Sequence, residues 1–141
     1  MPLFPSREWC EAAIRIANAD AEGTLAGQGW VGDFGAVVEA ELGKLQKPFA
    51  VHCVPVGGQI TRFRVLADPD ELDEIEPKYL VRAPYSAWKA LLQRRVDPIQ
   101  AIARGQFQFR GDLEQLARRM KYKGIADRIL AAVETQFPDE A

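Results

Sequence analysis

The feature that most constrains this chain is a pattern typical of a β-hairpin in residues 49–67. Residues 49–56 form an apolar run, and Gly57-Gly58 follows directly. In residues 60–67 apolar side chains alternate with arginines. Two consecutive glycines between such runs favour a tight turn between antiparallel strands. The sequence therefore predicts a hairpin across these residues.

Three other segments show strand-like patterns. Residues 33–42 alternate in polarity, which predicts one buried face and one solvated face. Residues 78–83 form a short strand, and residues 106–110 alternate with Phe107 and Phe109 on the inner side. Strands that bury one face need helices on that face only, so the predicted fold class is α+β rather than a doubly wound sheet.

Helical periodicity and capping residues predict the remaining elements. The glycine-rich stretch from Gly23 to Gly32 and the acidic stretch from Asp68 to Glu76 are expected to be loops. We expect a single domain of residues 1–141, with about five helices packed on one face of a five-stranded sheet. The predicted helices are residues 7–20, 84–95 and about 124–136, a short one from Asp97-Pro98 to Gly105, and one that follows Asp112.

Candidate catalytic residues do not combine into a recognisable active site. The single histidine, His52, lies within a predicted strand, where a structural hydrogen bond is the favoured interpretation. Cys10 and Cys53 match no metal-binding spacing and are expected to be reduced and partly buried. We therefore expect no enzymatic activity, no cofactor and no metal site. A thioester-handling enzyme is the least favoured alternative.

Charge is unevenly distributed along the chain, although the net charge is only −2. Residues 1–81 hold 7 Lys and Arg against 13 Asp and Glu, whereas residues 82–128 hold 11 against 4. A nearly neutral chain is not expected to bind nucleic acid. The basic half could orient the molecule on an anionic membrane surface, although a solvated helical face is the more ordinary interpretation.

The sequence shows no targeting signal or membrane span that we recognise. No apolar run approaches the roughly 20 residues that a membrane helix needs. The first residues, MPLFPSREW, are too polar for a signal peptide, and the last ones, PDEA, do not match a peroxisomal signal. We therefore expect a cytoplasmic protein.

Large apolar side chains are concentrated on the short helices and the last strand of the C-terminal half. Spacing alone favours a densely packed core. A gap between short helices, lined by adaptable side chains such as methionine, is the other interpretation. The candidate residues for lining such a gap are Trp88, Leu91, Leu92, Ile99, Ile102, Phe107, Phe109, Leu116, Met120, Ile125 and Ile129.

Residues 83–120, APYSAWKALLQRRVDPIQAIARGQFQFRGDLEQLARRM, resemble the sterol carrier protein family, that is, the type-two sterol-transfer domain. The similar features are the helix that leads to Trp88, the Asp97-Pro98 pair, the glycine at 105 and the pair Gly111-Asp112. The N-terminal part is more loosely similar to single-domain prokaryotic members.

The resemblance implies a five-stranded sheet with helices over one face and a hydrophobic tunnel between the layers. It also implies a non-enzymatic carrier of fatty acid, fatty acyl-CoA or sterol-like ligands, for which the apolar residues above are the candidate contacts. Basic groups near the mouth would hold a carboxylate or phosphate, and the candidates are Arg118, Arg119, Lys121 and Lys123.

The expected partners are a lipid or acyl-CoA ligand and, transiently, an anionic membrane surface, with a homodimer left open. The alternative is a protein-interaction or dimerisation domain that has a filled core and binds no ligand. A structure without a cavity larger than a few water molecules would favour this alternative.

Overall fold

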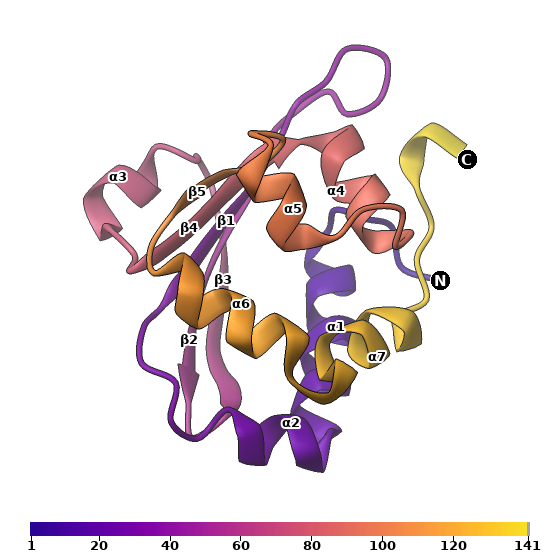
Figure 1. Ribbon diagram of the computed structural model, residues 1–141. Helices are drawn as coiled ribbons and strands as arrows, with labels where there is room; N and C mark the ends of the chain where they lie inside the picture. Colours follow the sequence, from indigo (N-terminus) through magenta and orange to yellow (C-terminus); the bar gives the residue numbers. More distant parts are fainter. Residues whose placement is uncertain (141) are drawn as a thin grey trace.

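Five strands in the computed structural model, which describes residues 1–140, form one sheet with the order β3-β2-β1-β4-β5 (Figure 1). The pair β1–β4 is parallel, and the other neighbouring pairs are antiparallel. This confirms the predicted α+β class with a five-stranded sheet. The strands are β1 (Phe34–Glu39), β2 (Phe49–Val56), β3 (Gln59–Leu66), β4 (Tyr79–Pro84) and β5 (Gln108–Arg110).

The predicted hairpin is present as β2 and β3, joined at Gly57-Gly58. Its register places Cys53 opposite Phe63 and shifts between Val54 and Pro55. A shift at this place is consistent with the proline, which has no N–H to give to the ladder. The sequence pattern therefore identified both strands and the turn.

Short helices make up most of the remaining structure. They are α1 (Arg7–Ala19), α2 (Ala21–Ala26), α3 (Glu71–Ile75), α4 (Tyr85–Leu92), α5 (Pro98–Ala103), α6 (Leu113–Lys121) and α7 (Ile125–Ala132), with single 3₁₀ turns η1 (Tyr122–Gly124) and η2 (Pro138–Glu140). Three predicted caps are confirmed, because Ser6, Asp97 and Asp112 each accept a hydrogen bond from the backbone N–H three residues later, at 3.1, 3.0 and 3.1 Å.

Two segments that were expected to be loops contain helices. The glycine-rich stretch begins within α2, whose first turn is held by Asp20 through a 2.8 Å hydrogen bond from the Gly23 N–H. The acidic stretch contains α3, although its sequence is dominated by carboxylates. Conversely, β1 ends at Glu39, and Leu42, which was expected on the strand, is fully exposed in the loop that follows.

The helix α3 covers the opposite face of the sheet from α4, α5, α6 and α7 (Figure 1). Leu72 of α3 packs with Val37, Ala50 and Leu66, whereas Val38 packs with Tyr85 on the other face. The consecutive β1 residues Val37 and Val38 are therefore both buried, at 1% and 5% exposure, on opposite faces of the sheet. The prediction of helices on a single face missed α3, because the buried Leu72 and the partly buried Ile75 stand among acidic residues in the sequence.

This arrangement predicts a strong effect of truncating Leu72. The side chain is 2% exposed, so Leu72→Ala should lower the free energy of unfolding by about 2–5 kcal/mol through lost burial and a residual cavity. Leu42→Ala is the matched control, and it should change stability by less than about 0.5 kcal/mol because Leu42 is fully exposed. Urea denaturation measures both values, and equal losses would contradict the role assigned to α3.

Candidate functional site

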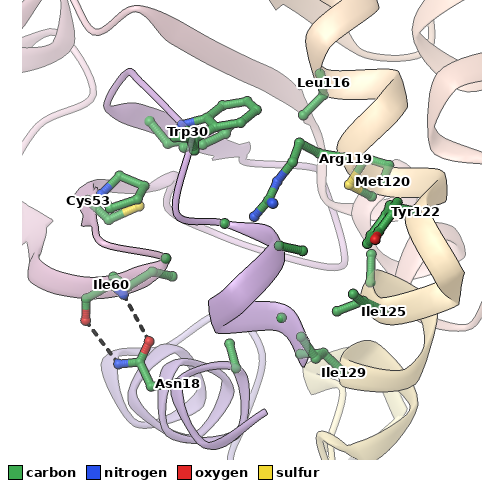
Figure 2. A pocket seen from close by; sticks show the side chains of 18 residues that line it. Asn18, Trp30, Cys53, Ile60, Leu116, Arg119, Met120, Tyr122, Ile125 and Ile129 are labelled. Carbon is green, nitrogen blue, oxygen red and sulfur yellow. Dashed lines mark hydrogen bonds between the residues drawn. The ribbon is translucent and has the colours of Figure 1, made fainter. Parts of the chain in front are cut away.

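An apolar pocket of about 240 Å³ lies between the first helices, the last helices and the hairpin (Figure 2). It exceeds the cavity of about 150 Å³ that admits benzene in an engineered core, and it approaches the lower limit of ligand pockets, about 300 Å³. The lining residues are Ala17, Asn18, Gly23, Ala26, Gly27, Trp30, Phe34, Cys53, Pro55, Gly58, Ile60, Leu116, Arg119, Met120, Tyr122, Ile125, Ala126 and Ile129.

The pocket has space because one of its walls is made of small residues. Ala17 of α1 and Gly23, Ala26 and Gly27 in and after α2 contribute almost no side-chain volume. The facing wall comes from α6 and α7, which contribute larger aliphatic side chains. The two walls meet at their edges, since a Cβ on Gly23 would lie 3.3 Å from Ile125 Cγ2 of α7.

The hairpin turn sets the position of α2. Gly58 has φ of +81°, and a Cβ placed on it would lie 1.9 Å from the carbonyl oxygen of Thr24 in α2. The backbone of α2 is therefore packed directly on the turn, at a distance that only glycine permits. The glycine pair that signalled a turn in the sequence thus also forms a helix contact.

Two further interactions hold the helices that surround the pocket. Asn18 at the end of α1 exchanges two hydrogen bonds with the backbone of Ile60 in β3, at 3.0 and 2.9 Å (Figure 2). Arg128 of α7 donates two hydrogen bonds of 2.9 Å to Asp20, the N-cap of α2. The hydrogen bonds from Arg128 and from the Gly23 N–H lower the pKa of Asp20. Asp20 therefore joins α2 to α7 and caps α2 at the same time.

Trp30 is held rigidly on the pocket wall. Its ring stacks on Phe34 with centroids 5.2 Å apart, and its indole N–H donates a 2.9 Å hydrogen bond to the Gly32 carbonyl. The guanidinium of Arg119 lies over the same ring, 5.7 Å from its centroid. Arg119 is the charged side chain among the lining residues, and burial lowers its pKa.

A second cavity, of about 590 Å³, lies beside β4 and α4 and has a more polar lining. Its charged residues Glu39 and Arg82 already pair with each other, with a 2.7 Å hydrogen bond from Arg82 Nε. The apolar pocket is therefore the better candidate site for an apolar ligand.

The model of the SCP-2 sterol transfer family matches residues 30–127. This chain belongs to the SCP-2 sterol transfer family. The family match includes β1 to β5 and the helices from α3 to α6, but it ends before the second half of α7 and leaves out α1 and α2. Part of the pocket wall in this family member therefore comes from outside the matched region.

Solved structures of sterol carrier proteins share the fold of this SCP-2 family member. A crystal structure of sterol carrier protein 2 has a TM-score of 0.72 at 20% identity and covers 92% of this chain and 98% of that one. A conserved hypothetical protein from Thermus thermophilus, named as a possible sterol carrier protein, has a TM-score of 0.74 at 20% identity and covers 96% and 92%.

The sterol carrier protein domain 2 of Helicoverpa armigera has a TM-score of 0.59 at 12% identity and covers 92% of this chain and 91% of that one. At these identities the likeness concerns the fold alone. No curated protein matches the chain at a significant level.

The predicted contact residues fall into two groups in this SCP-2 family member. Leu116, Met120, Ile125 and Ile129 line the pocket. The others lie elsewhere: Trp88, Leu91, Ile102 and Phe107 pack around Ala83 and Ala101, Leu92 packs near Tyr85, Phe109 lies beside Tyr79, and Ile99 is partly buried on α5. The expected tunnel stays a prediction, because the structure describes a pocket.

Sequence reasoning missed the N-terminal and hairpin contributions to the pocket. Trp30, Phe34, Cys53 and Ile60 all line it, and none was a candidate. The signal that could have indicated this wall is the frequent alanine and glycine in residues 17–27, which precede Trp30. Of the basic candidates, Arg119 lines the pocket, whereas Arg118, Lys121 and Lys123 are exposed.

The cysteines and the histidine have structural surroundings. Burial raises the pKa of Cys10 to about 12 and that of Cys53 to about 11, so both are thiols at neutral pH and poor nucleophiles. His52 Nε2 lies 2.7 Å from Asp33 Oδ2, which confirms the structural hydrogen bond. Burial alone would raise the pKa of Asp33, but hydrogen bonds from the Lys78 N–H and from His52 outweigh this effect and lower it.

Neither a metal site nor a membrane span is found within residues 1–140. These residues contain no cluster of three or more side chains that could ligate a metal. Their helices also include none with the length and apolar character needed to cross a bilayer.

The contact at Gly58 predicts a difference between two neighbouring glycines. Gly57→Ala should cost about 1–2 kcal/mol of stability, because Gly57 has φ of +60° but no atom within 4 Å of the new Cβ. Gly58→Ala should cost about 1–3 kcal/mol more, because its Cβ would collide with the Thr24 carbonyl and displace α2. Urea denaturation measures the difference, and equal costs would show that α2 does not depend on this contact.

The Asp20–Arg128 pair predicts a pH-dependent contribution to stability. The pKa of Asp20 is lowered in the folded state, so its stabilisation is fully present well above pH 3.8, the ordinary value, and is lost as pH falls through the lowered pKa. Wild type should therefore exceed Asp20→Asn in unfolding free energy near neutral pH, and the gap should close in acid. Asparagine still caps α2, so the gap reports the negative charge of Asp20, which Arg128 and the Gly23 N–H both favour. The same pH dependence in an Arg128→Gln background would contradict this assignment.

Proposed function

We propose that this member of the SCP-2 sterol transfer family is a non-enzymatic lipid carrier whose pocket receives the apolar part of a fatty acid, fatty acyl-CoA or sterol-like ligand. The observation that carries the proposal is the apolar pocket between α1, α2, α6, α7 and the hairpin. Family membership supports a lipid-binding or lipid-transfer role. The pocket supports the location of the ligand.

The chemistry of the lining suits an acyl chain. Trp30, Phe34 and Ile60 provide rigid apolar surface on the sheet side, and Met120 provides an adaptable side chain on the helix side. The hydrogen-bonding groups of Asn18 are already used by Ile60, so they do not compete for a polar ligand. Binding would be driven by removal of apolar surface from water, at about 0.8 kcal/mol for each CH₂.

Calorimetry with fatty acids of increasing length tests this role. Affinity should rise about fourfold with each added CH₂ until the pocket is filled, because each buried CH₂ adds about 0.8 kcal/mol. Affinity that stays constant with length would contradict burial of the chain. Mass spectrometry of the freshly purified protein under native conditions would in addition identify a lipid that copurifies with it.

A pair of adjacent variants locates the bound chain. Ala26→Trp places a large ring on the small-residue wall of the pocket and should weaken fatty acid binding at least tenfold. Leu25→Trp is the control, because Leu25 is 69% exposed beside it and does not line the pocket. Equal effects of the two variants would place the ligand elsewhere.

Delivery of a lipid requires contact with a donor or acceptor membrane, and the pocket side of the molecule has suitable side chains. Leu25, Val56 and Tyr122 are large, apolar and exposed, and Lys121 and Lys123 are exposed next to Tyr122. Such a combination suits transient contact with an anionic surface. The alternative of an interaction or dimerisation domain with a filled core is less favoured, because the pocket is not filled by side chains.

A further inference from the structure

We propose that Arg119 binds the anionic head group of the ligand, so that the pocket selects lipids with a terminal carboxylate or phosphate over neutral lipids of the same chain length. This inference rests on the proposed lipid-carrier function and narrows its ligand class. It is carried by the position of the Arg119 guanidinium in the pocket and by its lack of a carboxylate partner.

The guanidinium lies inside the pocket rather than in bulk solvent. Arg119 extends from α6 across the pocket towards the end of α2 (Figure 2). Its Nη2 is 2.8 Å from the position that a Cβ would take on Gly27, and its Cζ is 5.7 Å from the centroid of the Trp30 ring. A side chain at residue 27 would therefore crowd the guanidinium and also the Cα of Gly58, which is equally 2.8 Å away.

Among the residues that the structure describes, Arg119 has no carboxylate partner, unlike three other arginines of the fold. Arg128 is bound to Asp20, Arg82 is bound to Glu39, and Arg118 lies 3.7 Å from Glu114. Within residues 1–140, no carboxylate lies within 4.0 Å of the Arg119 guanidinium and no side-chain hydrogen bond involves it. A partly buried positive charge thus has no counter-ion.

An unpaired charge next to apolar walls is unfavourable, and an anionic ligand would remove the cost. Burial lowers the pKa of Arg119, which shows the direction of this cost, but a guanidinium stays protonated in proteins. A carboxylate or phosphate would supply both the opposite charge and acceptor oxygens for a two-pronged hydrogen bond. The apolar chain attached to it would then occupy the rest of the pocket.

The contact with Trp30 is compatible with this role. The Cζ of Arg119 lies over the Trp30 ring at 5.7 Å from its centroid, so the attraction is that of a cation to the face of an aromatic ring. This contact uses none of the five N–H donors in a conventional hydrogen bond, and the donors are available to an anion. A purely structural Arg119 would contribute to stability through the same contact, so the test must separate anion binding from folding.

The test compares three ligands with the same chain: dodecanoate, dodecyl phosphate and 1-dodecanol. Calorimetry should show that wild type binds at least one of the two anions about tenfold or more tightly than the alcohol. Arg119→Gln should remove this preference while changing the affinity for 1-dodecanol by less than about threefold. Arg118→Gln is the matched control, because it removes a neighbouring exposed charge from the same helix and should leave the preference intact.

The outcomes separate the inference from the function on which it rests. If wild type binds all three ligands equally, the carrier function stands and the role of Arg119 is wrong. If Arg119→Gln weakens all three equally, Arg119 is a structural residue and the inference is likewise wrong. If wild type binds none of the three, the proposed burial of a linear acyl chain in the pocket itself fails. If Arg119→Gln does not fold, Arg119→Met, which keeps much of the length and the apolar stem of the side chain, takes its place with the same expected loss of the anion preference.

Discussion

The position of β1 is the constraint on which the rest of the structure depends. It pairs with β2 on one side and, in parallel, with β4 on the other, so the N-terminal and C-terminal parts of the chain share one sheet. Both faces of the strand are covered, since Val37 packs towards Leu72 and Val38 towards Tyr85. A shift of one residue would exchange these contacts, so the register is strongly specified. Trp88 adds a 2.9 Å hydrogen bond from its indole N–H to the Val37 carbonyl.

The pocket and the charge distribution both follow from this shared sheet. Strand β2 of the hairpin pairs with β1, and the hairpin turn reaches α2. The helices α6 and α7 enclose the pocket from the other side (Figure 1). The acidic N-terminal and basic C-terminal halves also pair across the fold, through Asp20 with Arg128 and Glu39 with Arg82. Part of the charge asymmetry is therefore structural. Arg119 differs from these arginines because its charge is placed at the pocket without a pair.

Elements of the fold that depend on local interactions could be predicted from the sequence. The hairpin needs a glycine pair between two strand-like runs, and the helix starts at Asp97 and Asp112 need a carboxylate three residues before a backbone N–H. The helices α2 and α3 were not predicted, although Asp20 caps α2 in the same way, because they have only six and five residues and too short a span for helical periodicity to show. They are stabilised by distant contacts: α2 rests on the turn at Gly58, and Leu72 of α3 lies against the sheet.

The sequence by itself determined that large apolar side chains are concentrated on the short helices of the C-terminal half. It also indicated the family. Only the tertiary structure decided which of these side chains face a space. Helical spacing made Met120 and Trp88 candidates alike, yet Met120 lines the pocket together with small residues of α1 and α2, while Trp88 packs against Phe107. The difference depends on the side-chain volume on the opposite wall, and that wall comes from residues about a hundred positions away along the chain. Periodicity reports which side of a helix is apolar, but packing across the sheet decides whether that side meets a side chain or a cavity.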